Sequence, residues 1–388
     1  MMPQEKGPSA PFLNLENVDM SGSLTQLSSF GGENSRTDTW QSQLRHAIRD
    51  VDTLAQALKL SDGEKEASRH YTANDLPLGI TPHYLSLINP RDASDPLRKQ
   101  VVPQLLEQAP DLNDRVDPLG EEALEAVPFL VHRYPDRVLL LVTDRCASYC
   151  RFCTRKRMVG QGPTPKLDDL KQALEYIKAR TEIREVILSG GDALLLSDER
   201  LELILSELKK IQNVDRIRIA TRMLTFAPMR VTRQLVKILA THGPIYILSH
   251  FNHVNEISEE SIKAIEQLVN QGIPILNQTV LLRGVNDSVN ALSQLFTTLV
   301  NLRAMPYYLH QCDLVTGTSH FRVPIDESLN LLKQLRGNLS GLCIPTFVID
   351  IPGGKGKVPL VPDPIVSRSA SHLRLRGFNG EEALYPLT

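Results

Sequence analysis

The stretch Val138-Leu-Leu-Leu-Val-Thr-Asp-Arg-Cys146-Ala-Ser-Tyr-Cys150-Arg-Phe-Cys153 joins a short apolar run to three of the five cysteines of the chain. The run contains β-branched residues and has the length of a buried strand. The cysteines follow it at the spacing C-x3-C-x2-C. Cysteine thiolates ligate iron–sulfur clusters, and a four-iron cluster takes four ligands, so three cysteines leave one iron open. The stretch therefore predicts a strand that leads into a 4Fe-4S site.

Other uses of clustered cysteines fit this chain less well. Disulfide frameworks are typical of short secreted chains, whereas this one has 388 residues, an odd number of cysteines and no signal-peptide pattern. Zinc motifs usually pair two cysteine clusters, and no second C-x2-C is present. Two functions without catalysis stay open at this point. One is an iron–sulfur electron-transfer protein with a fully ligated cluster, and the other is a zinc-binding structural module.

The composition is typical of an enzyme with a large core. Hydrophobic residues make up 41% of the chain and the net charge is −2. A balanced charge gives no basic surface for nucleic acid or for an anionic membrane. No apolar run approaches the roughly 18 residues of a membrane span. We expect neither a nucleic-acid nor a membrane partner, and the thiolate site predicts a reducing, cytoplasmic location.

Changes in composition and hydrophobic pattern divide the chain into four predicted regions. Residues 1–37 are rich in Ser, Gly, Pro and Asn and predict a mobile N-terminal tail. Residues 38–130 predict a helical N-terminal region, residues 131–360 a barrel, and residues 361–388 a C-terminal segment. In the helical region we expect one helix, capped by Asp38, with a single apolar face. That face consists of Trp40, Leu44, Ile48, Val51, Leu54 and Leu58. A second helical segment is expected near Ile80–Leu87.

From Arg137 onward, short apolar runs alternate with amphipathic segments. The predicted strands are Val138–Thr143, Glu185–Ser189, Arg216–Thr221, Ile245–Ser249, Ile273–Leu281, Pro306–Gln311 and Pro345–Asp350. The predicted helices are Leu167–Arg180, Asp198–Ile211, Val231–Thr241, Glu259–Gln271, Asn290–Leu302 and Ile325–Leu335. A repeat of about 30 residues suits successive βα units. The pattern predicts an α/β fold whose parallel sheet forms a complete or partial (β/α) barrel.

Residues that suggest chemistry follow the predicted strands. In such barrels the reaction takes place at the carboxyl ends of the strands. The cysteine loop follows the first strand, and the residues at or near the ends of the later strands are Gly190, Gly191, Asp192, Thr221, Arg222, His250, Gln278, Asp313 and Asp350. We therefore expect these side chains to converge on one edge of the sheet.

A second motif, Asp350-Ile-Pro-Gly-Gly-Lys355-Gly-Lys357-Val-Pro, closes the last predicted strand. Its glycines allow close backbone approach, and their N–H groups can cradle an anion such as phosphate. A lysine beside such a cradle suggests a Schiff base with pyridoxal phosphate (PLP). A Walker A loop is disfavoured, because Val358 stands where that loop needs Ser or Thr. A flexible surface turn with solvated lysines is the alternative.

Together the two motifs resemble the lysine 2,3-aminomutase family, whose members are radical S-adenosylmethionine (SAM) enzymes that also use PLP. The resemblance runs from about Trp40 to Phe378. Its segments are Ile80-Thr-Pro-His-Tyr-Leu-Ser-Leu-Ile, His132-Arg133-Tyr-Pro-Asp-Arg137-Val, the cysteine motif with Thr154-Arg155-Lys-Arg, Leu188-Ser-Gly-Gly-Asp-Ala-Leu-Leu, His250-Phe-Asn-His, Asn277-Gln278, Leu281-Leu-Arg-Gly-Val-Asn-Asp, Pro306-Tyr-Tyr, Gln311-Cys-Asp313-Leu and the Asp350 loop. It implies an isomerase in which a deoxyadenosyl radical starts an amino shift.

The resemblance implies a role for each matching position. Cys146, Cys150 and Cys153 would be the metal ligands of the cluster. Five positions would contact SAM, namely Gly190, Gly191, Asp192, His250 and Gln278. Lys357 would form the Schiff base with PLP, and Arg133 and Arg137 would lie near its phosphate. A cellular reductant such as flavodoxin or ferredoxin would supply the electron.

The substrate implied by the resemblance is L-lysine, which would become β-lysine. Arg155 would hold its carboxylate, and Asp313 and Asp350 would hold its distal ammonium by charge-assisted bonds. A glutamate-type substrate would be repelled by these two carboxylates. Arginine fits the same pair through its guanidinium. A mutase of free lysine that serves translation-factor modification is also similar, at Tyr308-Leu309-His310-Gln311.

The chain departs from the family pattern in three places. The family has a zinc-binding C-terminal arm and a further cysteine in the loop after Gly284, whereas this sequence ends at Thr388 and has Ser288 in that loop. We therefore expect no structural zinc, and a homo-oligomer formed through that arm stays open. Lys355 replaces a glycine of the family loop. The segment Met223–Pro228 replaces a Pro-Val-Val type segment.

Overall fold

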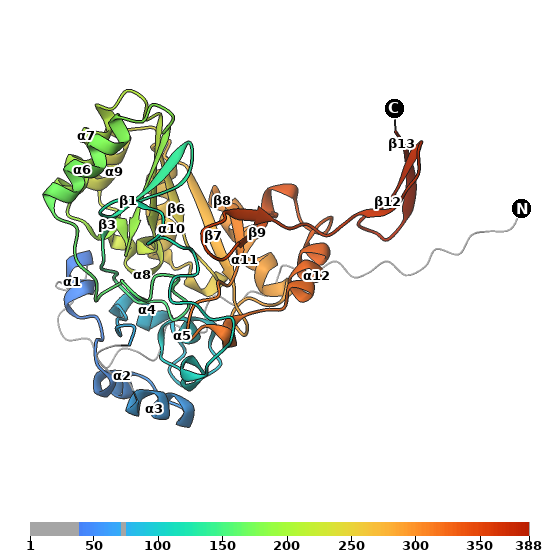
Figure 1. Ribbon diagram of the computed structural model, residues 1–388. Coiled ribbons are helices and arrows are strands. Elements are labelled where there is room, and N and C mark those ends of the chain that lie inside the picture. Colours follow the sequence, from blue (N-terminus) through green and yellow to red (C-terminus); the bar gives the residue numbers. More distant parts are fainter. Residues whose placement is uncertain (1–38, 71–74, 388) are drawn as a thin grey trace, which may run out of the picture. The chain divides into compact units, whose positions relative to one another are not determined.

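A computed structural model describes residues 39–70 and 75–387 of the chain (Figure 1). The tail predicted at residues 1–37 and the cap predicted at Asp38 lie outside the described residues. Among the residues that the structure describes, no helix is both long enough and apolar enough to cross a membrane.

A ten-stranded sheet, in the order β1 to β10 along the chain, organises the molecule (Figure 1). Its strands are β1 (Glu125–Val127), β2 (Leu130–Tyr134), β3 (Arg137–Thr143), β4 (Glu185–Gly190), β5 (Arg216–Thr221), β6 (Ile245–Ser249), β7 (Ile275–Leu281), β8 (Ala304–Gln311), β9 (Thr346–Asp350) and β10 (Lys357–Pro359). Neighbours from β3 to β9 are parallel, and β1, β2 and β10 add antiparallel edges. All seven predicted strands are present, so the α/β prediction is confirmed.

Helices connect the parallel strands and bury one face each. They are α6 (Leu167–Lys178), α7 (Asp198–Lys209), α8 (Met223–Phe226), α9 (Arg233–Thr241), α10 (Glu259–Val269), α11 (Val289–Asn301) and α12 (Ile325–Leu335). In α6, for example, Leu170, Ala173 and Ile177 recur on one face and are buried. This spacing is that of an amphipathic helix on an apolar core. The six predicted helices are confirmed, and α8 is an additional short helix that follows β5.

The sheet is a partial barrel rather than a complete one. No β-ladder joins the end strands β1 and β10 among the described residues. Side chains nevertheless connect the two ends of the sheet. Arg133 on β2 lies 3.4 Å from Asp350 on β9, and the backbone N–H of Lys357 on β10 donates to the Tyr134 hydroxyl at 2.8 Å. The last strands therefore lie across from the first, and the residues of both can belong to one site.

The N-terminal region is helical, but its first helix differs from the prediction. Two short helices, α1 (Trp40–Arg45) and α2 (Val51–Ala57), replace the single helix expected there. Asp50 ends the continuity, because its carboxylate accepts from the N–H of Thr53 and caps α2. Between the helices, Ile48 pairs with Ile80 through two backbone hydrogen bonds of 2.8 and 3.1 Å. Of the predicted apolar face, Ile48, Leu54 and Leu58 are buried and the other three residues are half-buried, and the spacing did not predict this break.

Four further elements complete this region and lie near the first strands. They are α3 (Asp62–Arg69), α4 (Pro82–Leu87), α5 (Pro96–Val101) and the short 3-10 helix η1 (Leu105–Gln108). The helical segment predicted near Ile80–Leu87 corresponds to α4, which Thr81 caps. The buried ion pair of Arg98 with Glu64, at 2.6 Å, ties α5 to α3.

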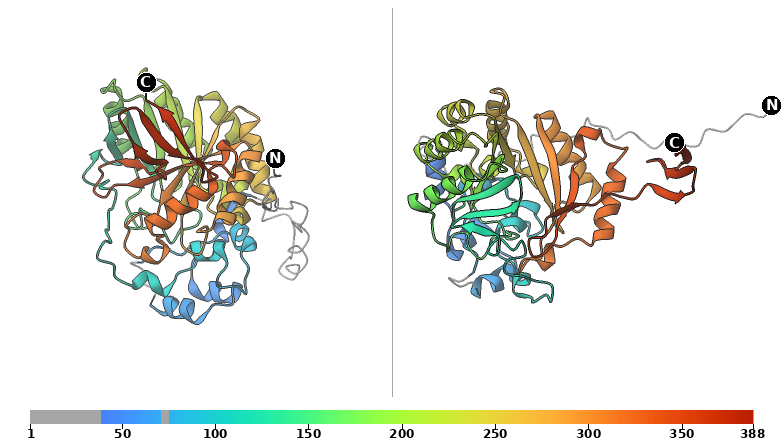
Figure 2. Two further views of the ribbon diagram at one scale, coloured as in Figure 1. Left: turned by 90° about the vertical axis from the view of Figure 1, so that its right-hand side faces the viewer. Right: turned by 45° about the horizontal axis from the view of Figure 1, so that its top comes forward.

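A separate three-stranded sheet ends the chain and was not predicted (Figure 2). Its strands are β11 (Ile365–Arg368), β12 (His372–Arg376) and β13 (Glu382–Pro386), all antiparallel. Asn379-Gly380 lies in the connection between β12 and β13, and this dipeptide is a typical hairpin signal. The Phe378 side chain packs against Gly337, where an added Cβ would overlap its ring. Apart from such contacts most residues of this sheet are exposed.

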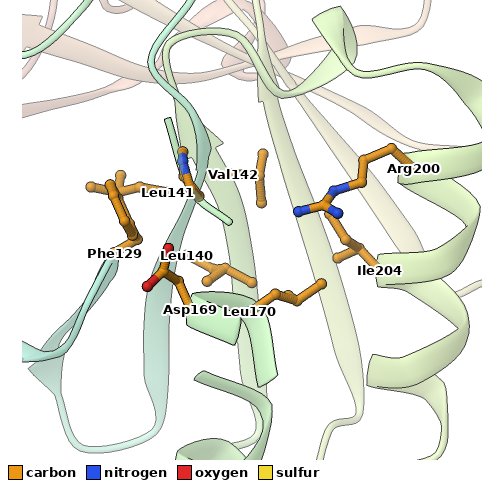
Figure 3. Close-up of a pocket in the computed structure, with 9 residues that line it drawn as sticks. Phe129, Leu140, Leu141, Val142, Asp169, Leu170, Arg200 and Ile204 are labelled. Carbon is orange, nitrogen blue, oxygen red and sulfur yellow. The ribbon is translucent and has the colours of Figure 1, made fainter. Parts of the chain in front are cut away.

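A small pocket lies on the helix-covered side of the first strands (Figure 3). Apolar residues of β3, α6 and α7 line it, including Leu140, Leu170 and Ile204. Its volume of about 10 Å³ suffices for roughly one water molecule. The pocket is therefore a packing defect in the core and not a substrate site.

Candidate active site

The cysteine loop follows β3, as the sequence predicts, and all three thiols are free and partly exposed. Backbone hydrogen bonds fix the loop: Tyr149 N–H donates to Gly79, Arg151 N–H donates to Gln100, and Cys153 N–H donates to Cys150. Burial raises the pKa of each thiol, that of Cys153 to about 11. Coordination to a metal removes this penalty, because a coordinating thiol is deprotonated outright.

The three thiols of the described loop do not surround a single metal position. In residues 39–70 and 75–387, no group of three or more His, Cys, Asp or Glu side chains converges on one ion. The cysteines of a four-iron cluster each bind a different iron, so they need not converge on one point. Three free thiols on one fixed loop are therefore a suitable donor set for a cluster.

Gly190 and Gly191 bring the end of β4 against the cysteine loop. A Cβ at either position would overlap a carbonyl oxygen, that of Thr143 for Gly190 and that of Arg145 for Gly191. Gly190 also has a φ of +117°, which favours glycine. Their backbones consequently lie directly beside the loop that carries Cys146.

Asp192 is buried and its carboxylate is already used within the fold. It accepts hydrogen bonds from the Thr221 hydroxyl at 2.7 Å, the Arg222 N–H at 2.7 Å and the Leu194 N–H at 3.0 Å. Burial raises its pKa against the effect of these bonds. In this structure Asp192 therefore ties the ends of β4 and β5 together, and it presents few free acceptor positions to a ligand.

Arg155 lies between the cysteine loop and a loop before β1. Its guanidinium donates to both carboxylate oxygens of Glu121, at 2.7 to 3.1 Å, and to the Ser189 hydroxyl at 3.2 Å. Glu121 is only 3% exposed. Burial acts to raise the pKa of Glu121, but the charges of Arg155 and Arg157 outweigh it and lower the pKa. Arg155 is thus a preoriented fork for a carboxylate, and Glu121 occupies it here.

Asp350, the last residue of β9, is surrounded by cationic and donor groups. It forms ion pairs with Lys357 and with Arg133, the latter at 3.4 Å, and its Oδ2 lies 3.6 Å from His310 Nδ1. Burial acts to raise the pKa of Asp350, but the contact with His310 and the charge of Lys357 hold it well below its usual value. This carboxylate is therefore ionised and multiply paired.

Asp313 follows β8, the neighbour of β9, and contrasts with Asp350. Among the described residues, no hydrogen bond or ion pair reaches its carboxylate. Burial and the nearby charge of Asp350 raise its pKa to about 7. The ionised form of this group is poorly stabilised by the protein alone. A bound cation would supply what is missing.

The structure separates the two lysines of the glycine loop. Lys357 points toward Asp350, and its Nζ lies 5.6 Å from the centre of the Tyr308 ring. Lys355 is exposed and has no ion pair among the described residues. Two positive-φ glycines, Gly353 and Gly354, form the turn between β9 and these lysines. The geometry therefore favours Lys357 for chemistry inside the site.

The two arginines expected near a phosphate differ in their surroundings. Arg133 donates to the Leu119 carbonyl at 2.7 Å, and its buried Nε has no hydrogen-bond partner. A buried guanidinium N–H without a partner fits a missing anion. Arg137 instead pairs with Asp136 at 2.7 Å and lies 3.8 Å from the centre of the Tyr134 ring. Arg133 thus provides a free donor for a phosphate, whereas Arg137 is more exposed and already paired.

His250 directly follows β6, and Gln278 lies on β7. Burial and the charge of Arg222 hold the pKa of His250 well below its usual value, so the imidazole is neutral. Its Nε2 lies 3.0 Å from Asn252 Oδ1. Gln278 on β7 pairs in register with Tyr308 on β8. His250 therefore lies at the carboxyl edge of the sheet that also carries Asp313, whereas Gln278 lies in the middle of β7, beside Tyr308.

Three participants were not assigned a role from the sequence. Glu121 occupies Arg155, His310 contacts Asp350, and Arg222 donates to Cys150. His310 belongs to the stretch Tyr308-Leu309-His310-Gln311, which indicated only a resemblance to the translation-factor mutase. Glu121 lies in the segment Asp117-Pro-Leu-Gly-Glu121, whose turn residues alone gave no sign of its partner.

Comparisons with known proteins identify the family of the chain. The family model described as the radical SAM superfamily matches residues 140–295, and the one described as lysine-2,3-aminomutase matches residues 332–387. L-lysine 2,3-aminomutase of Clostridium subterminale is 45% identical over 347 residues, covering 89% of this chain and 83% of the relative. The Bacillus subtilis L-lysine 2,3-aminomutase is 44% identical, covering 89% and 74%. Glutamate 2,3-aminomutase of Clostridioides difficile is 40% identical, covering 92% and 84%.

Proposed function

Because this chain belongs to the lysine 2,3-aminomutase family within the radical SAM superfamily, we propose that its substrate is L-lysine and its product β-lysine. The family identifies an isomerase of the 2,3-aminomutase type and implies a 4Fe-4S cluster and SAM. Relatives named for lysine and for glutamate both match at 40% identity or more, so the substrate must be argued from the site.

Three groups that the chain would bind supply the radical chemistry. The cluster and SAM would provide the radical that removes hydrogen from the substrate, and PLP would provide the π system that lets the nitrogen move. Cys146, Cys150 and Cys153 would hold the cluster. Lys357 would hold PLP, and the free Nε of Arg133 would donate to its phosphate. Tyr308, below the Lys357 Nζ, would provide a flat surface for the ring.

The observation that carries the choice of lysine is the unpartnered carboxylate of Asp313 beside Asp350. The two residues end neighbouring parallel strands, β8 and β9. Burial and the nearby charge of Asp350 both raise the pKa of Asp313, which is consistent with the two carboxylates facing one ligand group. An ammonium placed between them would stabilise both, since charge-assisted hydrogen bonds are about twice as strong as neutral ones.

Glutamate fits this pair poorly. Its side-chain carboxylate would be a third negative charge at the same place, and like charges in a partly dry site repel strongly. Lys357 and Arg133 are the cations nearest to Asp350, and both already pair with it. The net charge around the distal end of the substrate therefore favours an ammonium.

Arg155 would bind the α-carboxylate of the substrate at the other end. Its guanidinium already holds a carboxylate in bidentate fashion, that of Glu121. The substrate would have to share or replace this contact. Glu121 keeps the fork oriented in the absence of substrate, which reduces the entropy cost of binding.

Arginine is the second candidate, because its guanidinium also suits two carboxylates. The stretch Tyr308-Leu309-His310-Gln311 supports a third candidate, a mutase of free lysine that serves translation-factor modification. His310 contacts Asp350, so it gives no reason to prefer either of these two candidates.

The test is anaerobic turnover of the full chain after reconstitution with iron, sulfide and PLP. Flavodoxin or dithionite would reduce the cluster, and L-lysine, L-arginine and L-glutamate would be offered separately with SAM. We expect β-lysine from L-lysine. β-Arginine or β-glutamate as the sole product would assign arginine or glutamate as the substrate in place of lysine. Deoxyadenosine without any β-amino acid would reject the aminomutase reaction for these substrates.

A further inference from the structure

Arg222 directs a buried guanidinium at one of the three cysteines. It directly follows β5, and its Nη1 donates to the Cys150 sulfur at 2.8 Å. Arg222 itself is 7% exposed. The contact joins residues 72 positions apart in the sequence. A charged donor at this distance is a strong hydrogen bond to a thiolate.

The rest of the guanidinium is fixed by the fold. Nε donates to the His250 carbonyl at 3.2 Å, and Nη2 donates to Gln100 at 3.1 Å and to Glu256 at 2.7 Å. With the bond to Cys150, four of its five N–H groups have partners. The Phe226 ring lies 4.4 Å from its central carbon. Arg222 is therefore not available as a clamp for a substrate anion.

Glu256 is the counter-charge of Arg222 and is also fixed. It is fully buried, and the Tyr84 hydroxyl donates to it at 2.9 Å. Its second oxygen accepts from the N–H groups of Asn252 and His253, at 2.6 and 3.1 Å. The carboxylate cannot turn away from Arg222 without losing these bonds. The chain thus holds one positive and one negative charge at fixed positions near the cysteine loop.

The three cysteines are not equivalent in this respect. Cys153 accepts only a longer bond of 3.4 Å, from the backbone N–H of Arg155. Arg155 itself directs its guanidinium to Glu121 and Ser189. Among the described residues, Cys150 is the one of the three loop cysteines whose sulfur accepts a hydrogen bond from a charged side chain. One corner of a cluster held here would therefore experience a localised positive charge.

We propose that Arg222 and Glu256 set the reduction potential of the cluster through Cys150, a role that rests on the proposed cluster site. Reduction adds one negative charge to the cluster. The Arg222 hydrogen bond stabilises that charge and moves the potential to less negative values, whereas the Glu256 carboxylate moves it back. Hydrogen bonds to the sulfurs and local charge are established determinants of such potentials. Arg222 acts through a ligand and is therefore a positioning residue.

The two charges predict shifts of opposite sign, which a merely structural role does not. Arg222→Met removes the donor and the charge, so the midpoint potential should become more negative. Glu256→Gln keeps an acceptor for Tyr84 but removes the negative charge, so the potential should become less negative. Arg230→Met is the matched control. Arg230 is also fully buried and ion-paired, to Asp198 at 2.7 Å, but it donates to no cysteine.

The measurement is a redox titration of the reconstituted full-length variants, followed by electron paramagnetic resonance, with iron and sulfide content determined in parallel. Opposite shifts for Arg222→Met and Glu256→Gln, with no shift for Arg230→Met, support the proposal. Unchanged potentials at full iron content overturn it and leave the cluster site intact. If Arg222→Met fails to hold iron, Glu256→Gln decides: a less negative midpoint potential supports the proposal, and an unchanged or more negative one overturns it. An unmodified chain that binds no cluster rejects the proposed function itself.

Discussion

The two sides of the candidate site differ in how completely their polar groups are satisfied. On the β3–β5 side, Asp192 and Arg222 have nearly all their hydrogen-bonding positions filled by the protein. On the opposite side, formed by β2 and β8–β10, the Asp313 carboxylate, the Arg133 Nε and the His310 Nε2 have no partner in the part of the chain that the structure describes.

This difference distinguishes a scaffold from a binding site. Buried polar groups are normally paired, so the unpartnered Arg133 Nε and His310 Nε2 are positions that a ligand could complete, and the Asp313 carboxylate lacks a counter-ion. The satisfied side holds the cysteine loop in a fixed shape, and only the thiols remain for iron. The unsatisfied side offers one cation-seeking and one anion-seeking group, which suit an ammonium and a phosphate. Substitutions on the two sides should therefore fail in different ways.

The largest effect is expected on the satisfied side. Replacing Cys146, Cys150 or Cys153 with Ala should reduce turnover to the background and lower the iron content. Cys343→Ala is the matched control, since Cys343 is also a free cysteine but is buried outside the loop. It should cost about 1 kcal/mol of stability and keep the cluster. Iron and sulfide analysis with the absorbance of the cluster checks both. Full iron in a loop-cysteine variant would contradict the assignment.

The second effect concerns the two lysines of the glycine loop. Lys357→Ala should lower turnover by at least about 100-fold, because the cofactor would lose its covalent anchor and its position. The visible absorbance of the PLP Schiff base should disappear. Lys355→Ala should leave both unchanged, since Lys355 is exposed and unpaired among the described residues. The reverse pattern would assign the anchor to Lys355.

A smaller effect is expected at the carboxylate pair. Asp313→Asn removes one charge from the proposed ammonium site, and a hydrogen bond to a charged group contributes about 1.5–3 kcal/mol. The KM for L-lysine should rise by about 10- to 100-fold, while SAM affinity stays unchanged. Asp363→Asn, on an exposed loop, is the control. An unchanged KM in Asp313→Asn would remove the main support for lysine.

The pH dependence should be the smallest effect and should sharpen the same contrast. The pKa of Asp313 is raised to about 7, so in the free protein this carboxyl is largely protonated below pH 7 and ionised above it. A cationic substrate needs the ionised form. The KM for L-lysine should therefore fall as the pH rises through 7, by about tenfold between pH 6 and pH 8. Asp313→Asn should lose this dependence. Asp350 should not titrate in this range, because its pKa is held well below normal.

The parallel sheet could be predicted from the sequence because most of its strands bury one face and bury or half-bury the other, as in β5 and β7. Apolar runs of four to eight residues with β-branched side chains are distinctive, and every predicted start lies within two residues of the observed one, as with Ile273 against Ile275 and Pro306 against Ala304. Because the strands are parallel, the residues that follow them share one edge. Asp313 and Asp350 could be placed together for that reason alone.

What could not be predicted depends on contacts between distant residues. The break between α1 and α2 follows from the pairing of Ile48 with Ile80, which no local pattern encodes. The bond from Arg222 to Cys150 and the occupation of Arg155 by Glu121 join residues 72 and 34 positions apart. The C-terminal sheet lacks a buried face. Only β12 alternates apolar and polar residues, through Leu373 and Leu375, so the clearest local sign of a hairpin was Asn379-Gly380.

The most direct test of the central claim is a competition. The reconstituted, reduced enzyme would receive SAM, PLP and equal concentrations of L-lysine and L-glutamate under anaerobic conditions, and the β-amino acids would be quantified by mass spectrometry. The ratio of products gives the ratio of kcat/KM for the two substrates. The carboxylate pair of Asp313 and Asp350 predicts a large excess of β-lysine. A large excess of β-glutamate would contradict the assignment of these residues and the choice of lysine.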